Sequence, residues 1–225
     1  MLPSSNLSKS QMDRLGDRLR KGDISDGDLR LLDSYRRSFS KSYEEVVQLI
    51  EDELGFEATG RPAKSTTSII EKLRRERIRL SQMQDIAGCR IITSTLAQQD
   101  NIVTRIPEIF DQCTIVDRRE RPSHGYRAVH VIVNRSSKLI EVQIRTSLQH
   151  TWAELSEKLA DEFDSSIKYG GGSERIASYL SELSVAMLNT EIALKIGDGN
   201  QIMIETQRLF ELVGKFGALV DSERE

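Results

Sequence analysis

The sequence predicts an α+β protein: a small mixed β-sheet flanked by helices, with further helices at the N- and C-terminal ends. Three observations lead to this prediction. Short β-branched runs lie between Cys89 and Ile144, apolar residues recur at helical spacing on either side of them, and 225 residues are enough for one sizeable core but few for two full domains. We therefore expect one core domain with helical extensions.

The N-terminal part, from about Leu7 to Leu54, has apolar residues at helical spacing with an interruption at residues 22–27. This pattern predicts two helices, of which the second is long. Gly60-Arg61-Pro62 then breaks the pattern, and Ser65 or Thr66 can cap a helix that runs to about Leu80.

Basic residues are concentrated in a band between Arg61 and Arg79, although the chain as a whole has a net charge of −3. The net charge argues against a protein that coats nucleic acid through its overall field. A local basic band is expected where a cleft binds polyphosphate, and it is also the pattern of a solvated helix face. Its members are Arg61, Lys64, Lys72, Arg74, Arg75, Arg77 and Arg79.

Four apolar runs predict the strands of the sheet, at residues 89–93, 113–116, 128–133 and 139–144. A helix near Gln98 to Phe110 separates the first two strands, and residues 134–138 form a good hairpin connection between the last two. Three more helices follow, at 147–164, 173–196 and 201–220, with a flexible break at 170–172.

These elements suggest three segments. We expect an N-terminal helical extension (1–58), a core (59–165) and C-terminal helices (173–225) that pack on the core or form an oligomer interface. Cys89 and Cys113 lie in predicted strands, where a thiol behaves as a small core residue. No apolar run approaches the roughly 20 residues of a spanning helix, and there is no signal peptide, so we expect a cytoplasmic protein without a membrane partner.

Several polar residues occupy positions where a plain sheet would favour apolar ones. Asp85 precedes the first strand, and Glu141, Gln143 and Arg145 alternate with apolar residues along the fourth, so these three share one sheet face. A carboxylate and an arginine on one face can be a structural ion pair. Two carboxylates brought together by adjacent strands also form a hard oxygen site suited to Mg²⁺, which normally arrives with substrate phosphates.

The three histidines of the chain, His124, His130 and His150, lie in one stretch of sequence around the third and fourth strands. Their spacing is not that of a zinc hydrolase, and hydrogen bonding to phosphate, ribose or other site residues fits better. Tyr126 follows Gly125 in a polar loop that enters the third strand, where a glycine allows close approach of a ligand. The tyrosine can stack on a nucleobase or pack on the sheet edge.

Four motifs in this order resemble the synthetase domain of the RelA/SpoT family, and together they are highly specific. They are Arg61-Pro62-Ala63-Lys64 with Ser68-Ile69-Ile70-Glu71-Lys72; Asp85-Ile86-Ala87-Gly88-Cys89-Arg90; His124-Gly125-Tyr126-Arg127-Ala128-Val129-His130; and Glu141-Val142-Gln143-Ile144-Arg145-Thr146 with Gln149-His150-Thr151-Trp152-Ala153-Glu154. The resemblance implies a nucleotidyltransferase-like sheet and a small stand-alone synthetase. Toxin-like small members of the family are similar to this chain in length.

The resemblance also implies a reaction: transfer of the β,γ-pyrophosphate of ATP to the 3′-hydroxyl of GDP or GTP, giving guanosine alarmones. Asp85 and Glu141 would be the catalytic and Mg²⁺-binding residues, with Glu141 accepting the proton of the attacking hydroxyl. The ATP-binding residues implied are Arg61, Lys64, Lys72 and Arg90. The acceptor-binding residues implied are His124, Tyr126, His130, Gln143, Arg145 and His150, with Tyr126 stacked on the acceptor base.

Three alternatives for the function stay open at this point. The acceptor loop lacks the lysine that the family carries before its Gly-Tyr pair, so an adenosine nucleotide or the 3′-terminal adenosine of transfer RNA remains a candidate acceptor. Basic residues of the N-terminal helices would then grip the RNA backbone, namely Arg18, Arg20, Lys21, Arg36, Arg37 and Lys41. A catalytically silent nucleotide-binding module is the third alternative. The resemblance is also consistent with a homo-oligomer and a neutralising antitoxin protein.

Overall fold

The computed structural model describes residues 8–224, which form eight α-helices, two short 3-10 helices and a five-stranded sheet. The chain divides into two compact units. We call residues up to Ile91 together with Pro107–Thr114 and Val131–Gln143 the N-terminal unit, and Ile92–Ile106, Ile115–His130 and the residues from Ile144 onward the C-terminal unit. Strands β2, β3, β4 and β5 contribute residues to both units, and each unit is described by itself.

The sheet has the strand order β1-β2-β5-β4-β3, so the predicted mixed sheet flanked by helices is confirmed. Its strands are β1 (Ala58–Arg61), β2 (Ala87–Thr93), β3 (Cys113–Asp117), β4 (Val129–Arg135) and β5 (Lys138–Thr146). The last four were predicted from their apolar runs. Strand β1 was missed, because Gly60 looked like a break; it pairs antiparallel with β2 as an edge strand, and Arg61 lies opposite Gly88.

The hairpin between β4 and β5 turns through Ser136 and Ser137, whose φ angles are both positive at 51° and 62°. Two positive φ angles in a two-residue connection are characteristic of the hairpin turn that matches strand twist. Along β5, Ile140, Val142 and Ile144 are fully buried, whereas Glu141 and Gln143 between them are partly exposed. The predicted alternation of buried apolar and more exposed polar residues is therefore confirmed in β5.

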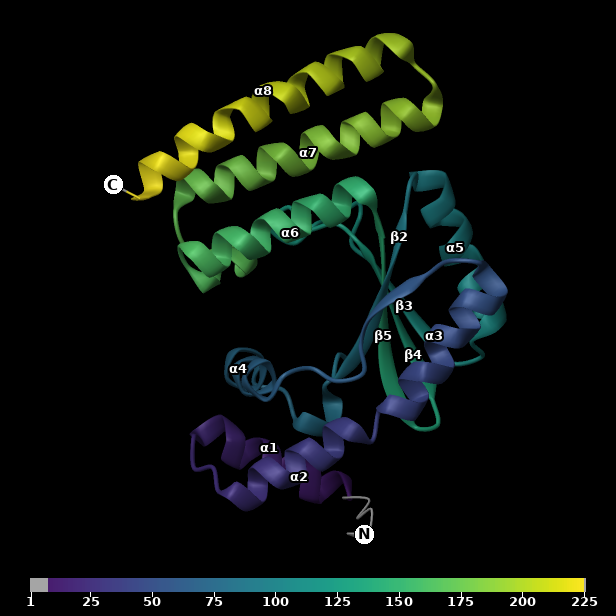
Figure 1. The fold of residues 1–225 in the computed structure, drawn as a ribbon, viewed down its shortest axis with the longest axis vertical. Coiled ribbons are helices and arrows are strands. Elements are labelled where there is room, and N and C mark those ends of the chain that lie inside the picture. The colour runs from purple at the N-terminus through teal and green to yellow at the C-terminus, as the bar shows by residue number, and fades with distance from the viewer. Residues whose placement is uncertain (1–7, 225) are drawn as a thin grey trace. The chain divides into compact units, whose positions relative to one another are not determined.

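Four helices belong to the N-terminal unit (Figure 1): α1 (Lys9–Lys21), α2 (Asp26–Arg37), α3 (Ser40–Leu54) and α4 (Thr66–Glu76). The prediction of one long second helix was wrong, because the chain breaks between α2 and α3. At the break, Ser38 Oγ donates to the carbonyl of Tyr35 at 2.6 Å, and Phe39 is buried with its ring 5.1 Å from that of Tyr35. The hydroxyl competes for a helical carbonyl, and the aromatic contact holds the turn.

Helix α4 begins as predicted, since Ser65 Oγ accepts from the Ser68 amide at 3.1 Å. It ends at Glu76 rather than near Leu80, because Arg77 adopts a left-handed conformation with φ of 52°. The short helix η1 (Leu80–Gln82) follows. Arg20 of α1 donates to the Leu73 carbonyl at 3.0 Å and also to that of Ile78, so α1 holds the end of α4 in place.

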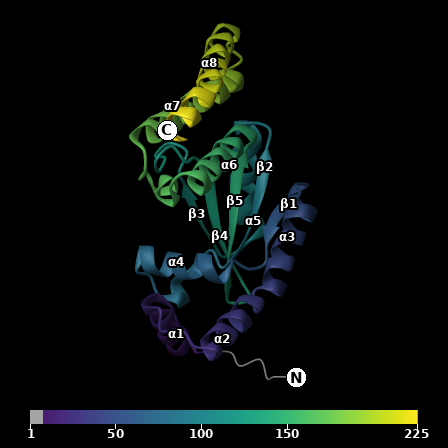
Figure 2. The same cartoon turned by 60° about the vertical axis from the view of Figure 1, so that its left-hand side comes forward.

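The C-terminal unit contains most of α5 (Leu96–Ile109), then α6 (Ser147–Glu162), η2 (Ser165–Tyr169), α7 (Glu174–Ile196) and α8 (Gly199–Arg224). Helices α7 and α8 lie side by side as a hairpin (Figures 1 and 2). A core of Trp152, Leu159, Ile176, Leu180 and Leu183 packs α6 against α7. Within the described residues, none of the helices has the length and apolar character needed to cross a membrane.

Candidate active site

Asp85 lies between two lysines in the N-terminal unit. Lys64 Nζ is 2.7 Å from Asp85 Oδ2, and Lys72 Nζ is 2.9 Å from Asp85 Oδ1. Burial raises the pKa of the Asp85 carboxyl, but the charges of Lys64 and Lys72 and their hydrogen bonds outweigh it, so the pKa lies below its usual value. Three residues from the first two motifs therefore form one charged cluster, which we call the Asp85 cluster.

The position of Lys64 is fixed by its own backbone. Its amide donates to the Ile86 carbonyl at 2.6 Å, which ties the segment before α4 to the entry of β2. Its carbonyl accepts from Nε of Arg36, on α2, also at 2.6 Å. Lys72 is placed differently, by the regular geometry of α4, whose Ile69 and Leu73 are fully buried.

Glu141 lies on the strand next to β2, where its carboxylate accepts from Gln143 Nε2 at 2.8 Å. A Cβ placed on Gly88 would lie 2.8 Å from the Glu141 carbonyl oxygen, so only glycine allows β2 to approach β5 so closely. Asp85 is three residues before Gly88 in the chain. The predicted pair of carboxylates is thus supplied by the entry of β2 and by the adjacent strand.

These donors fit Mg²⁺ in one particular way. Within residues 8–224 there is no group of three or more His, Cys, Asp or Glu side chains placed to hold a metal ion. Mg²⁺ commonly binds through one or two carboxylates and completes its coordination with water and substrate phosphates. Asp85 and Glu141 would hold the ion in this manner, and it would supply neutralisation of phosphate charge.

The two arginines predicted to bind ATP lie at the β1–β2 edge of the sheet. Arg61 ends β1 and is exposed, and Arg90 is a partly exposed residue of β2 opposite Thr59. Cys89, between these positions, is buried, and burial together with the charge of Glu141 raises the pKa of its thiol to about 12. Cys89 and Cys113 are both free thiols.

A second cluster forms around Tyr126 in the C-terminal unit, and we call it the Tyr126 cluster. Arg145 donates to the tyrosine hydroxyl at 2.8 Å, and that hydroxyl lies 3.0 Å from His130 Nε2. The Arg145 guanidinium also lies over the tyrosine ring, 5.0 Å from its centroid, and the Trp152 ring is 6.4 Å away. Three residues predicted to bind the acceptor are therefore brought together.

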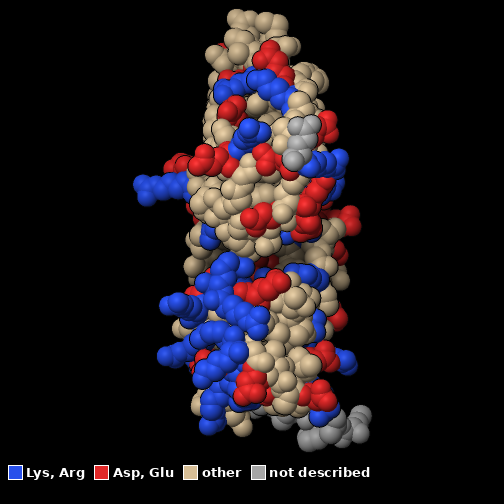
Figure 3. Space-filling view, turned by 90° about the vertical axis from the view of Figure 1, so that its left-hand side faces the viewer, with Lys and Arg blue, Asp and Glu red and all other residues tan. Residues whose placement is uncertain are grey.

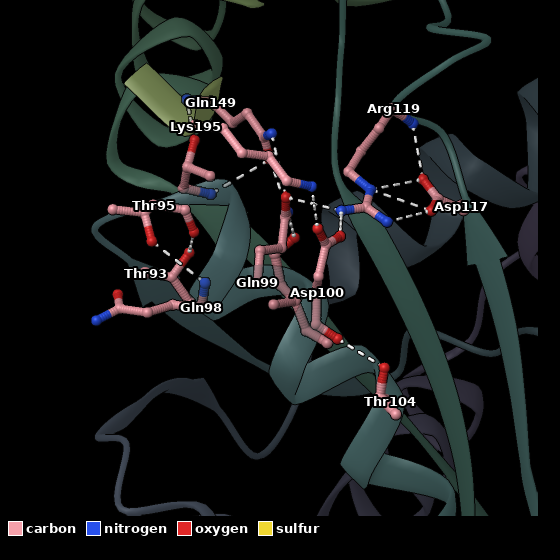
Figure 4. A network of polar contacts seen from close by, with 12 residues as sticks. Thr93, Thr95, Gln98, Gln99, Asp100, Thr104, Asp117, Arg119, Gln149 and Lys195 are labelled. Atoms are coloured by element: carbon pink, nitrogen blue, oxygen red, sulfur yellow. Dashed lines mark hydrogen bonds and ion pairs between the residues drawn. The ribbon is translucent and has the colours of Figure 1, made fainter. Parts of the chain in front are cut away.

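The loop that carries Tyr126 is anchored at both ends. Arg119 binds Asp117 at 2.6 Å and Asp100 of α5 at 2.6 Å (Figure 4). At the other end, Arg127 donates to Ser184 Oγ at 3.1 Å and to the carbonyl of Arg119. Ser184 of α7 in turn donates to the Gly125 carbonyl at 2.6 Å. The loop backbone next to Tyr126 is thus held by contacts with both α5 and α7.

The remaining two histidines make contacts of their own. His124 is exposed with φ of 52°, and its ring packs so closely on Gly170 that a Cβ there would lie 2.0 Å from His124 Nδ1. His150 Nε2 is 3.4 Å from Glu154 Oε1, one turn along α6. Their predicted roles with an acceptor remain predictions.

Sequence reasoning missed the residues that position the two clusters. Arg36 is 28 residues from Lys64, and Ser184 is 59 residues from Gly125, so no local pattern connects them. The role of Arg119 was easier to predict from the sequence. It lies two positions after Asp117, at the end of a strand, so the Asp117 carboxylate is within its reach.

Three of the N-terminal arginines considered for RNA binding make contacts within the N-terminal unit. Arg36 holds the Lys64 carbonyl, Arg20 holds the end of α4, and Arg18 binds the buried Asp28 at 2.6 Å. These three guanidinium groups make internal contacts. Arg37 is 2.8 Å from Asp33 and Lys41 is 4.0 Å from Glu45, and both are well exposed, as is Lys21.

The mixed sheet flanked by helices defines an α+β protein. Residues 60–162 match the family described as the region found in RelA/SpoT proteins. The match falls on the region whose motifs predicted the resemblance to this family.

The relatives are bacterial. The chain is 41% identical over 120 residues to the uncharacterized protein Mb1401 of Mycobacterium bovis, covering 52% of this chain and 44% of that protein. It is 34% identical over 124 residues to the GTP pyrophosphokinase YjbM of Bacillus subtilis, covering 48% of this chain and 58% of that protein. The chain thus spans about half the length of the curated relatives it matches.

Solved structures extend the similarity beyond the matched region. The small alarmone synthetase 1 of Bacillus subtilis, bound to its product pppGpp, is 27% identical with a TM-score of 0.57. The match covers 78% of this chain and 98% of that one. A GTP pyrophosphokinase family protein from Streptococcus pneumoniae, 21% identical with a TM-score of 0.55, shares the fold over 89% of this chain and 98% of its own.

Proposed function

We propose that this chain is an Mg²⁺-dependent pyrophosphokinase that transfers the β,γ-pyrophosphate of ATP to the 3′-hydroxyl of GDP or GTP. The observation that carries the proposal is the Asp85 cluster, in which two ammonium groups each lie within 2.9 Å of one carboxylate. Phosphoryl-type transfer needs alignment and charge neutralisation more than covalent chemistry from the protein. Lysines provide the charge, and the carboxylate provides a metal ligand.

The transfer balances with groups on this chain. The acceptor 3′-oxygen forms a bond to the β-phosphorus of ATP, the bond from that phosphorus to the α,β-bridging oxygen breaks, and AMP leaves with the electron pair. Glu141 accepts the proton of the 3′-hydroxyl, while Gln143 holds the carboxylate by donating to Oε2 at 2.8 Å. Lys64, Lys72, Arg61 and Arg90 would bind the ATP, and the pppGpp complex of the Bacillus subtilis relative supports a guanosine acceptor.

Transfer RNA is a second candidate acceptor, and one surface feature favours it. Lys and Arg side chains gather over α1, α4 and the segment after α4 (Figure 3), where the exposed residues are Arg14, Lys21, Arg74, Arg75, Arg77 and Arg79. A basic face of this kind can bind a phosphate backbone. The internal contacts of Arg18, Arg20 and Arg36 place any such surface on α1 and α4 rather than across all the N-terminal helices.

One experiment separates these candidates. The purified protein is incubated with Mg²⁺ and ATP labelled at the β-phosphate, and GDP, GTP, AMP, ADP and deacylated transfer RNA are offered separately. We expect label on GDP or GTP and none with Glu141→Gln. Label on RNA alone, or on AMP and ADP alone, would reject GDP and GTP as the acceptors in favour of the labelled molecule. No label on any of them would favour a catalytically silent nucleotide-binding module.

We also propose that copies of this chain associate through α8. Only Leu212 of α8 is buried, while Met203, Phe210 and Val213 are 67%, 69% and 62% exposed. The large residues lie on the same helix face as Gly214 and Gly217, where an added Cβ would meet nothing within 4 Å. Large and small residues along one face allow the same face of a second copy to pack against it.

Phe210→Glu should give monomers by light scattering, with Glu211→Gln as the control. A neutralising protein partner stays a prediction.

A further inference from the structure

The Asp85 cluster has a feature that metal binding alone does not explain. Both carboxylate oxygens of Asp85 already contact ammonium groups, at 2.7 and 2.9 Å, and only 16% of the side chain is exposed. The lysines are similarly covered, with 17% and 19% of their side chains exposed. A bare divalent cation would therefore have to displace two like charges from the oxygens it needs.

Other charges around the cluster do little to offset this. Glu76 lies 3.7 Å from Lys72, but it is 39% exposed and also contacts Arg75 at 2.9 Å. An exposed and shared carboxylate attracts Lys72 less than the partly buried Asp85 does. Glu141, the other proposed metal ligand, lies on β5 with its carboxylate bonded to Gln143. In direct contact, two ammonium groups face the single carboxylate of Asp85, and this local positive charge disfavours a free cation at Asp85 and favours a polyphosphate.

The chain also limits where Lys64 can go. Its amide is held by the Ile86 carbonyl and its carbonyl by Arg36, both at 2.6 Å. With the backbone fixed at both peptide groups, the flexible side chain alone can swing away from Asp85. Arg36 is thus a positioning residue, which keeps the ammonium group near the carboxylate without contacting it.

We propose that Lys64 and Lys72 act as internal counter-ions of Asp85, so that this carboxylate becomes available to a divalent cation only when a polyphosphate draws the lysines away. The inference rests on the proposed function in that it concerns the same nucleotide site. It adds an order of events, because the metal is admitted with the phosphates rather than before them. Asp85 exchanges its lysine partners for the cation while the lysines pair with the phosphates, so that no buried charge is left unpaired.

The test measures two ligands separately, without turnover. Binding of Mn²⁺ alone is followed by electron paramagnetic resonance, and binding of inorganic tripolyphosphate without metal is followed by calorimetry. Lys72→Met and Lys64→Met should each bind bare Mn²⁺ ~10-fold or more tightly than the wild type, because a unit charge next to the metal position is gone. The same variants should bind tripolyphosphate more weakly.

These opposite shifts distinguish the inference from simple damage to the fold, which would weaken both ligands. Lys41→Met, at a lysine whose side chain is 89% exposed, is the matched control and should change neither affinity. Adding Asp85→Asn to Lys72→Met should abolish the gain in Mn²⁺ affinity. Equal Mn²⁺ affinity in the wild type and both lysine variants, or a gain that survives Asp85→Asn, would overturn the proposal.

The outcome is independent of the transfer assay. Opposite shifts in a protein that labels no acceptor would keep the counter-ion role and reject the pyrophosphokinase. Transfer to GDP or GTP with unchanged Mn²⁺ affinity in the lysine variants would keep the pyrophosphokinase and reject the counter-ion role.

Discussion

The Asp85 cluster of the N-terminal unit and the Tyr126 cluster of the C-terminal unit are built on different physical principles. The Asp85 cluster consists of full charges in contact, with Lys64 and Lys72 on opposite oxygens of one carboxylate. In the Tyr126 cluster, the Arg145 guanidinium both donates to a hydroxyl and lies over an aromatic ring. Charge pairs can be exchanged for phosphates and a metal, whereas the aromatic cluster offers shape, hydrogen bonds and a ring.

Their supports differ as well. The Asp85 cluster is positioned by the Lys64 backbone, which Ile86 and Arg36 hold, together with a regular helix. The Tyr126 cluster is positioned by a loop that is anchored at Asp100 on one side and at Ser184 on the other. The first arrangement leaves side chains able to move, and the second fixes a surface in advance, which lowers the ordering cost of binding.

The largest expected effect is that of Asp85→Asn. The variant removes a metal ligand and the counter-ion of two lysines, so transfer should fall by about 10²–10³-fold or more, while circular dichroism shows the fold retained. Asp161→Asn, at an exposed carboxylate that pairs with Lys168, is the matched control. Unchanged transfer by Asp85→Asn would refute the metal role.

Tyr126→Phe tests the aromatic cluster and should act on the acceptor alone. It keeps the ring beneath Arg145 but removes the hydroxyl that joins Arg145 to His130. Loss of these hydrogen bonds should raise the KM for the acceptor about 3- to 10-fold and leave the KM for ATP unchanged. Tyr126→Ala, which also removes the ring, should cost more, and a shift in the ATP KM of equal size would show that the two clusters are not separate in function.

Arg36→Met tests positioning in the Asp85 cluster, and its effect should be smaller. Loss of the bond to the Lys64 carbonyl should raise the KM for ATP by about 3- to 10-fold, with kcat and the acceptor KM little changed. Arg36→Lys should recover part of the loss, because it can still donate one hydrogen bond. The neighbouring Arg37→Met, at a side chain that is 80% exposed, is the control and should have no effect.

The smallest effect expected is one of stability, and it compares Asp85 with Glu191 of α7. Burial raises the pKa of Glu191 above its usual value, despite hydrogen bonds with Thr146 and Gln149 and the charges of Arg127 and Arg119. A raised pKa favours folding below the unfolded value of about 4.3, and this contribution is lost as the pH rises through the folded value. Glu191→Gln should therefore raise the Tm relative to the wild type more at pH 8 than at pH 4.

Asp85 should show the opposite pH dependence. Its pKa is lowered, so its contribution to stability is fully present above about pH 4, the unfolded value, and is lost only as the pH falls through the folded one. The stability difference between the wild type and Asp85→Asn should consequently stay constant from pH 5 to 8 and change only below that range. A change in that difference between pH 5 and 8 would contradict the lysine pairing.

The sequence by itself determined four of the five strands, most helix positions and the residues of both clusters, because these depend on local apolar periodicity and on motif composition. It could not show that Ser38 divides a helical stretch, that Arg77 ends α4, or that Ala58–Arg61 forms an edge strand. Only the tertiary structure decided which lysines contact Asp85, and that Arg36 and Ser184 hold the two clusters in place. Such contacts join residues far apart in the chain, where spacing along the sequence carries no information about distance.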